Sequence, residues 1–349
     1  MNVADSEMIE GILKTKKYSS IDSMDKADII FVNTCAIREH AEEKVHSRLG
    51  VFSRIKHNNP DVIIGVLGCM AQHLKDDILD TKPYVDIILG PDSYRKLPEL
   101  LERKMEDKDN IVDTQLSRYE VYDNFFPSRK EGINAWVSIM RGCDKFCTFC
   151  IVPFTRGRER SRSINSIVNE VKKAVDEGFI EITLLGQNVN SYKYKNFSFD
   201  YLLKEIADIS GVERLRYTSP HPEDMTDEVL HVMAHYDNIC NAVHFPLQAG
   251  SNRILNRMNR TYTRDHFIEK SNRIREILPN CGLSTDIIVG FPGETNSEFE
   301  KTLDVMNEVK FDSAFTFKYS PRSGTKAHEY SDQLSEIDKQ ARLEKVIEL

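Results

Sequence analysis

The stretch DVIIGVLGC, residues 61–69, is apolar at almost every position and ends at a cysteine. A short, nearly continuous apolar run favours a strand buried on both faces, as in parallel sheets covered by helices. Residues 27–35, ADIIFVNTC, repeat the pattern, and a third apolar run covers residues 85–89. Helical periodicity at 3–13 and 39–56 accompanies these runs. The amino-terminal part of the chain therefore predicts an open parallel α/β domain.

Two cysteines, Cys35 and Cys69, stand where predicted strands end. Because ligands of open α/β sheets bind outside the carboxyl ends of the strands, the two thiols are expected to face one crevice. Two thiolates are too few to hold an iron–sulfur cube, so a third ligand would be needed. Cys240 and Cys281 stand in no ligand-like spacing and are interpreted as core thiols.

The alternation of strands and helices starts again after a weakly patterned stretch at 101–132, which predicts a boundary and linker. Candidate strands follow at residues 135–140, 181–185, 214–219, 242–247, 283–289 and 313–319, and candidate helices at 164–177, 199–209, 264–278 and 297–309. Six βα units predict a partial or complete parallel barrel, with its chemistry at the carboxyl ends of the strands. The predicted domains are residues 1–122 and 129–349.

The strongest chemical signal is the spacing C-x₃-C-x₂-C of Cys143, Cys147 and Cys150, directly after the first predicted barrel strand. Three thiolates in one short loop can hold three irons of a [4Fe–4S] cube and leave the fourth iron open to a substrate or cofactor. A zinc site is the alternative, but zinc usually takes four ligands and no fourth cysteine or histidine lies nearby in the sequence.

The composition excludes several other classes of protein. The 349 residues are 40% hydrophobic and 29% charged, so collagen-like and wholly disordered chains are excluded. No apolar run is long enough to span a bilayer, and no export signal opens the chain, so a cytoplasmic protein without a membrane partner is expected. The cysteines number seven, which argues against a disulfide framework. The net charge is −8, so any nucleic-acid site must be a local basic patch.

At the three-cysteine motif the chain resembles the radical S-adenosylmethionine superfamily, and more narrowly its methylthiotransferase family. The narrower resemblance rests on NTCAIR at 33–38, GCMA at 68–71 and the opening MNVADSE at 1–7. It implies a partial (β/α)6 barrel and two [4Fe–4S] clusters, with Cys143, Cys147 and Cys150 on the radical cluster and Cys35 and Cys69 on the auxiliary one. It also places the first strand and the first auxiliary cysteine upstream of Met1, and an RNA-binding β-barrel domain after the last residue.

Four further stretches resemble the branch of this family that acts on isopentenylated tRNA: CIVPFTRGRERSR at 150–162, LLGQNVNSY at 184–192, TSPHP at 218–222 and STDIIVGFPGE at 284–294. The resemblance implies conversion of N6-isopentenyl-adenosine beside the anticodon to its 2-methylthio form, with two S-adenosylmethionine molecules per turnover. The alternatives are a relative acting on threonylcarbamoyl-adenosine or on a ribosomal-protein aspartate, and a non-catalytic iron–sulfur RNA-binding module.

The same resemblance suggests further binding residues and partners. The candidate cofactor-binding residues are Phe149, Gln187, Asn188, Gln248 and Gly290. Arginine at every second position of an extended chain would put four guanidinium groups on one side, so the candidate RNA-binding residues are Arg156, Arg158, Arg160 and Arg162. The alternative role for this run is to bind the carboxylate of S-adenosylmethionine. The expected partners are the anticodon stem-loop of tRNA and an external electron donor, and the expected state is a monomer.

Overall fold

The computed structural model describes the whole chain except residues 36–38, 108 and 131, and the side chains of residues 39–42. Residues 36–38 of the NTCAIR stretch therefore lie outside the described part. The chain forms two compact units. The first comprises residues 1–132 and 151–162, and the second comprises residues 133–150 and 163–349. In the described residues no helix is both long and apolar enough to cross a membrane.

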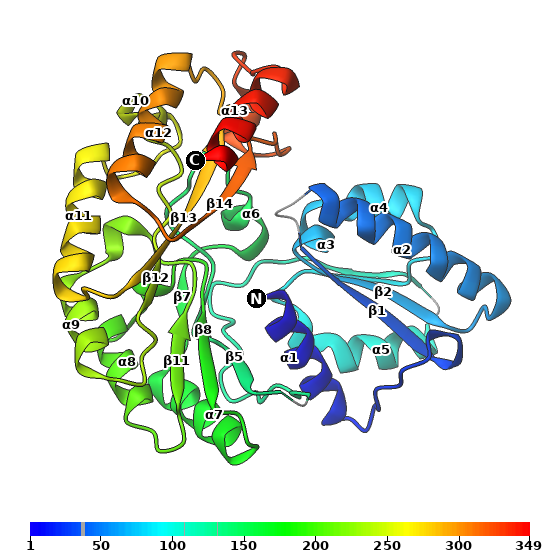
Figure 1. Cartoon of the computed structure of the whole chain (residues 1–349). Helices are drawn as coiled ribbons and strands as arrows, with labels where there is room; N and C mark the ends of the chain where they lie inside the picture. The colour runs from blue at the N-terminus through cyan, green and yellow to red at the C-terminus, as the bar shows by residue number, and fades with distance from the viewer. Residues whose placement is uncertain (36–38, 108, 131) are drawn as a thin grey trace. The chain divides into compact units, whose positions relative to one another are not determined.

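The first unit is an open parallel sheet with helices on both faces (Figure 1). Its sheet has the order β1-β2-β3-β4, and every neighbouring pair is parallel. The strands are β1 (Ile29–Thr34), β2 (Ile63–Gly68), β3 (Ile87–Leu89) and β4 (Ile111–Asp113), with the two-residue β7 (Arg160–Ser161) outside this sheet. The helices are α1 (Asn2–Lys14), α2 (Glu39–Asn58), α3 (Cys69–His73), α4 (Lys75–Thr81), α5 (Leu97–Glu106) and α6 (Val152–Arg156).

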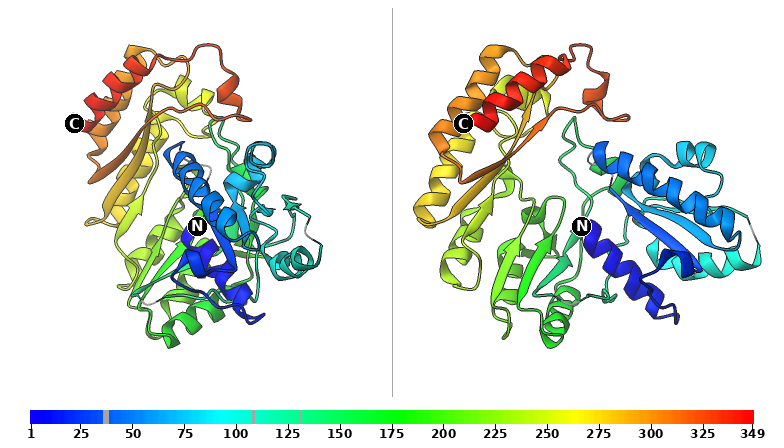
Figure 2. Two further views of the ribbon diagram at one scale, coloured as in Figure 1. Left: turned by 90° about the vertical axis from the view of Figure 1, so that its right-hand side faces the viewer. Right: turned by 45° about the vertical axis from the view of Figure 1, so that its right-hand side comes forward.

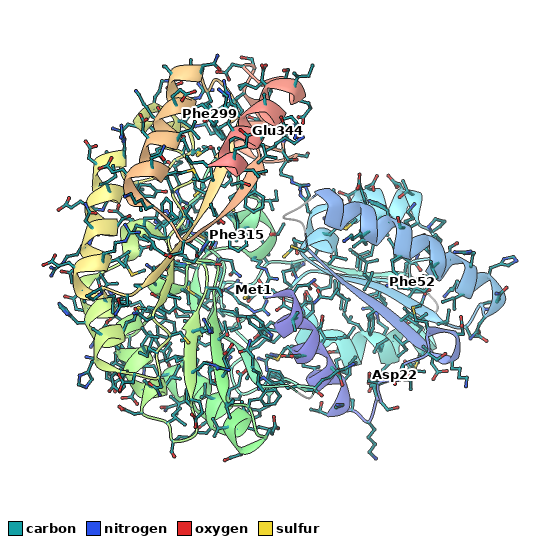
Figure 3. All side chains as sticks on the ribbon, viewed as in Figure 1. Met1, Asp22, Phe52, Phe299, Phe315 and Glu344 are labelled. Atoms are coloured by element: carbon teal, nitrogen blue, oxygen red, sulfur yellow. The ribbon has the colours of Figure 1, made fainter. Side chains whose placement is uncertain are left out.

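Strand β2 explains why the sequence shows a continuous apolar run. Successive side chains of a strand point to opposite faces of a sheet. Ile63 and Leu67 pack in the cluster that includes α1 and α5, whereas Ile64 and Val66 pack in the cluster under α2. Phe52 of α2, labelled in Figure 3, belongs to the second cluster. The predicted open parallel α/β domain is confirmed.

The second unit contains six parallel strands arranged as two three-stranded sheets, β11-β8-β5 and β12-β13-β14. Parallel bridges continue the pairing at Leu215–Ile239 and Gln248–Ile287. The strands are β5 (Asn134–Ser138), β6 (Met140–Arg141), β8 (Glu181–Leu185), β11 (Arg214–Tyr217), β12 (Ala242–His244), β13 (Gly282–Val289) and β14 (Ser313–Lys318), plus the small β9 (Lys193–Tyr194) and β10 (Phe197–Ser198).

Helices form the outer layer of this unit, as Figure 1 and Figure 2 show. They are α7 (Ile164–Asp176), α8 (Phe199–Ala207), α9 (Asp227–His235), α10 (Asn252–Arg257), α11 (Arg264–Ile277), α12 (Asn296–Val309) and α13 (Glu336–Glu348). Helix α7 begins where the Ser163 side chain accepts a hydrogen bond from the Ser166 amide, and it buries Ile164, Ile167 and Val171 on one face. That spacing is the helical repeat of an amphipathic helix. The predicted partial (β/α)6 barrel is confirmed.

Two features differ from the sequence-based expectations. The second half of helix α5 and the whole of strand β4 lie in the stretch predicted to be a linker. Strand β4 has only three residues, too few for a periodic pattern to show. Residues 151–162, predicted to belong to the barrel domain, group with the first unit, and the change between the units comes at residue 132.

The turn after β12 is held close against α12. The Gly250 amide donates to the Thr302 hydroxyl at 2.9 Å, and a methyl group at position 250 would overlap the carbonyl oxygen of Lys301. Backbone cannot yield as a flexible side chain can, so this turn has room only for glycine.

We expect Gly250→Ala to destabilise the second unit by about 1–3 kcal/mol, the usual cost of overpacking. Thermal unfolding followed by circular dichroism would measure the loss. Gly50→Ala is the control, because a methyl group at that helical position meets nothing within 4 Å. The control should be neutral or stabilising. Equal melting temperatures for Gly250→Ala and the unmodified protein would contradict the packing described for this turn.

Candidate functional site

The three clustered cysteines lie in the loop that follows β6, and all three are half-buried. The loop is fastened to the end of α10. The Thr148 amide donates to the Met258 carbonyl at 3.0 Å, and the Thr148 hydroxyl donates to the Arg257 carbonyl at 2.8 Å. The Asn259 side chain donates to the carbonyls of Lys145 and Phe146, each at 3.0 Å. The loop that carries the thiols is therefore preformed by the fold.

The donor set in this loop fits an iron–sulfur cube. Three thiols stand within eight residues, and Arg260 Nη1 donates to Cys147 Sγ at 3.4 Å. Hydrogen bonds to the ligand sulfurs are a usual feature of such clusters. Among the described residues no three His, Cys, Asp or Glu side chains converge on one metal ion. A cube does not require such convergence, because each thiolate binds a different iron.

Unsatisfied polar atoms gather at the same carboxyl edge of the barrel. Both side-chain polar atoms of Gln187, Oδ1 of Asn188, Nε2 of His221 and Oε1 of Gln248 are buried without a hydrogen-bond partner among the described residues. These four residues follow strands β8, β11 and β12. A buried polar group without a partner costs about 1–3 kcal/mol. Several at one edge indicate a site for a polar ligand that would satisfy them.

The Asn188 side chain is oriented by a carboxylate in the segment that follows strand β11. Its Nδ2 donates to the Asp224 carboxylate at 2.6 Å, and Lys145 of the cysteine loop pairs with the same carboxylate at 2.8 Å. Because Nδ2 is engaged, the oxygen Oδ1 is left as an acceptor in the site. An acceptor at this place suits an ammonium group.

His221 is a site residue that the sequence did not reveal. It is 5% exposed, and its Nδ1 accepts a hydrogen bond from the Glu223 amide at 3.3 Å. The ring proton therefore lies on Nε2, the nitrogen without a partner. Burial, with the positive charges of Arg260 and Lys145, lowers the pKa of His221 to about 2. His221 thus presents a neutral N–H donor, and a lone histidine has no spacing pattern by which it could have been found.

Gln248 is held in a backbone conformation that glutamine rarely adopts. Its φ is +69°, in the left-handed region. The Gln248 amide donates to the Asp286 carbonyl at 2.8 Å, and the Gln248 carbonyl accepts from Ile288 at 2.9 Å. Such conformations persist where surrounding contacts impose them and often mark ligand sites. The side chain is only 7% exposed, with Oε1 unsatisfied.

The remaining two candidate cofactor residues have evident packing roles. The Gly290 amide donates to Glu294 Oε2 at 2.7 Å, and that carboxylate pairs with Arg342 at 2.7 Å. The Phe149 ring packs edge-on against Phe291, with centroids 6.5 Å apart. Contact of Gly290 and Phe149 with a cofactor stays a prediction.

Cys35 and Cys69 lie at the ends of neighbouring strands in the first unit. Strands β1 and β2 are parallel with Thr34 beside Gly68, so Cys35 and Cys69 follow at matching positions of neighbouring strands. Neighbouring strands lie about 4.8 Å apart. Burial raises the pKa of the Cys69 thiol, and the nearby Cys35 adds to the increase, while Arg156 opposes it. The strand register therefore places Cys35 and Cys69 side by side, and their role as cluster ligands stays a prediction.

The four arginines at 156–162 do not share one exposed side, so that part of the prediction is wrong. Arg158 is exposed, whereas Arg156, Arg160 and Arg162 are 6%, 8% and 1% exposed. Their carboxylate partners are Asp5 at 2.6 Å, Asp92 at 3.0 Å and Asp123 at 3.7 Å, in that order. The physical reason is local, because residues 152–156 form helix α6 and Gly157 turns the chain at φ +71°. Residues 156–162 are therefore not one extended strand, and their arginine side chains do not all point to the same side.

Comparison with protein families divides the chain in the same way. Residues 137–306 match the family described as the radical SAM superfamily. Residues 1–90 match the family described as "Uncharacterized protein family UPF0004".

Among curated proteins, the chain is 46% identical to the tRNA-2-methylthio-N6-dimethylallyladenosine synthase of Parabacteroides distasonis. It is 44% identical to the synthase of the same name from Clostridium tetani. Each alignment covers 100% of this chain and 78% of the relative. Among solved structures, the radical S-adenosylmethionine methyltransferase TsrM from Kitasatospora setae, with cobalamin and a [4Fe–4S] cluster bound, has a TM-score of 0.70 at 14% identity. That alignment covers 93% of this chain and 73% of TsrM, and supports the fold.

We expect the His221 ring to stay neutral, with its proton on Nε2, from about pH 8 to about pH 5, where an ordinary histidine with a pKa near 6.5 is mostly protonated. Below about pH 6.5 the unfolded chain binds this proton and the folded chain does not, so His221 makes the folded state less stable as the pH falls. Nitrogen-15 NMR of labelled histidine, assigned by the signal lost in His221→Gln, would test this. A His221 ring that titrates near pH 6.5 would contradict the burial and charge environment described.

Proposed function

Because the chain belongs to the radical S-adenosylmethionine methylthiotransferase family, we propose that it converts N6-isopentenyl-adenosine beside the tRNA anticodon to its 2-methylthio derivative. Membership in the family implies a [4Fe–4S] cluster and S-adenosylmethionine. The observation that carries the proposal is the carboxyl edge of the barrel, where a preformed three-thiol loop stands with four buried residues whose polar atoms lack partners.

Different residues at this edge would bind the [4Fe–4S] cluster and S-adenosylmethionine. Cys143, Cys147 and Cys150 would hold the radical cluster, which when bound supplies the electron that cleaves S-adenosylmethionine. The Asn188 oxygen would accept a hydrogen bond from the amino group of the cofactor, and the neutral His221 N–H would donate one to an acceptor atom of the cofactor. Gln187 and Gln248 offer further polar contacts from the neighbouring strand ends.

A second, auxiliary [4Fe–4S] cluster is part of the proposal. Cys35 and Cys69 supply two of its ligands, and their matching positions at the ends of β1 and β2 support this role. Two S-adenosylmethionine molecules are used per turnover, one to methylate sulfur and one to activate the C2–H bond of adenine. The electrons come from an external donor.

Arg158 is the exposed member of the arginine run, and its guanidinium chemistry suits a tRNA phosphate. A net charge of −8 makes such a contact local rather than a property of the whole chain. A monomer acting in the cytoplasm, where tRNA is found, completes the proposal.

The first test concerns the radical cluster. We expect Cys147→Ala to lose about four irons per chain and to abolish 5′-deoxyadenosine formation from S-adenosylmethionine, because a cube with two thiolate ligands is not retained. Iron analysis and chromatography of the reaction products would measure both. Cys240→Ala is the matched control, since Cys240 stands outside both cysteine groups and should change neither quantity. If Cys147→Ala keeps the iron content and the 5′-deoxyadenosine yield of the unmodified protein, the proposed radical reaction is contradicted.

The second test separates the two cysteine groups. Cys69→Ala should leave 5′-deoxyadenosine formation within about twofold of the unmodified protein, since the radical-cluster loop is intact, yet yield no 2-methylthio product. Mass spectrometry of nucleosides from isopentenylated tRNA, after incubation with the full-length protein, S-adenosylmethionine and a reductant, would measure the product. Persistence of the methylthio nucleoside with Cys69→Ala would show that Cys69 is not required for sulfur transfer.

A further inference from the structure

Arg156 belongs to the arginine run, yet its guanidinium is directed at a sulfur atom. Nε donates to Cys69 Sγ at 3.1 Å, and Nη2 donates to the Asp5 carboxylate at 2.6 Å. The third nitrogen, Nη1, is buried and has no hydrogen-bond partner among the described residues. Cys69 and Asp5 are themselves only 6% and 1% exposed. The guanidinium is therefore enclosed, fixed on two sides and unsatisfied on the third.

This arrangement is poorly suited to binding a phosphate. A phosphate would have to reach a side chain that is 6% exposed and compete with a carboxylate already paired at 2.6 Å. The thiol partner is also unusual, since sulfur is a weak acceptor until it is ionised or bound to metal. A buried arginine that donates to a cysteine is explained more directly if that sulfur carries negative charge as a metal ligand.

We propose that Arg156 is a positioning residue for the auxiliary cluster, holding the Cys69 thiolate through Nε and offering Nη1 to a further sulfur of the group bound there. This inference rests on the proposed function, because it requires the second cluster. A cube with thiolate ligands carries net negative charge, and arginine keeps its own charge when buried, as lysine often does not. Asp5 fixes the planar fork so that one edge faces the sulfur.

The effect of Arg156 on the auxiliary cluster can be measured without turnover. Hydrogen bonds and positive charge next to cluster sulfurs stabilise the reduced, more negative cluster and so raise its reduction potential. Removing the guanidinium should shift the potential of the auxiliary cluster to a more negative value. The radical cluster would obscure this signal, so it must be removed by substitution.

The experiment uses the full-length, reconstituted protein in which Cys143, Cys147 and Cys150 are all replaced by alanine. Redox titration followed by electron paramagnetic resonance would give the midpoint potential of the remaining cluster. In this background Arg156→Met should shift the potential to a more negative value, and Arg156→Lys, which keeps a charge but loses the fork, should shift it less. Arg162→Met is the control, because it removes a buried guanidinium of the same segment whose carboxylate partner is Asp123 instead of Asp5.

The outcomes distinguish the two proposals. If the triple-alanine protein binds no iron, the auxiliary cluster itself is refuted, and the role of Arg156 with it. If it binds a cluster whose potential and spectrum are the same with Arg156 as with methionine or lysine, the role of Arg156 alone is overturned. If Arg156→Met fails to fold, the lysine variant decides, since its altered spectrum with retained iron supports the inference and an unchanged spectrum contradicts it.

Discussion

A single buried guanidinium connects three segments of the first unit that are far apart in the sequence. Arg156 at the end of α6 reaches Cys69 at the start of α3 and Asp5 in α1. Removing one member of a buried ion pair typically costs about 3–5 kcal/mol, so Asp5 and Arg156 depend on each other. The segment that follows the three-cysteine loop thus belongs to the unit that carries Cys35 and Cys69.

The geometry of parallel sheets brings the candidate site residues together in both units. Parallel strands end at one edge, so residues that follow neighbouring strands are brought together whatever their separation in the sequence. In the first unit this places Cys35 next to Cys69. In the second it collects Gln187, His221 and Gln248 at the edge where the cysteine loop lies. The fold places these residues side by side, and their thiol, amide and imidazole groups determine which ligands they can bind.

The sequence predicted most of this architecture because apolar runs and cysteine spacing are local signals. The run at 61–69 predicted β2, and the alternation after residue 133 predicted the barrel strands. The predicted family and function agree with the synthases that are 44–46% identical over the whole chain. What failed was the arginine run, since no periodicity reveals that α6 and Gly157 would turn the chain and bury three of its four guanidinium groups. The orientation of Asn188 was equally hidden, because it depends on Asp224, which is 36 residues away.

The central claim is that the carboxyl edge of the barrel generates a radical that removes hydrogen from C2 of the target adenine. Isopentenylated tRNA carrying deuterium at that carbon, incubated with the full-length protein, S-adenosylmethionine and a reductant, tests it directly. The account predicts that one deuterium appears in 5′-deoxyadenosine for each methylthio nucleoside formed. Methylthiolated product accompanied by 5′-deoxyadenosine without deuterium would contradict the account.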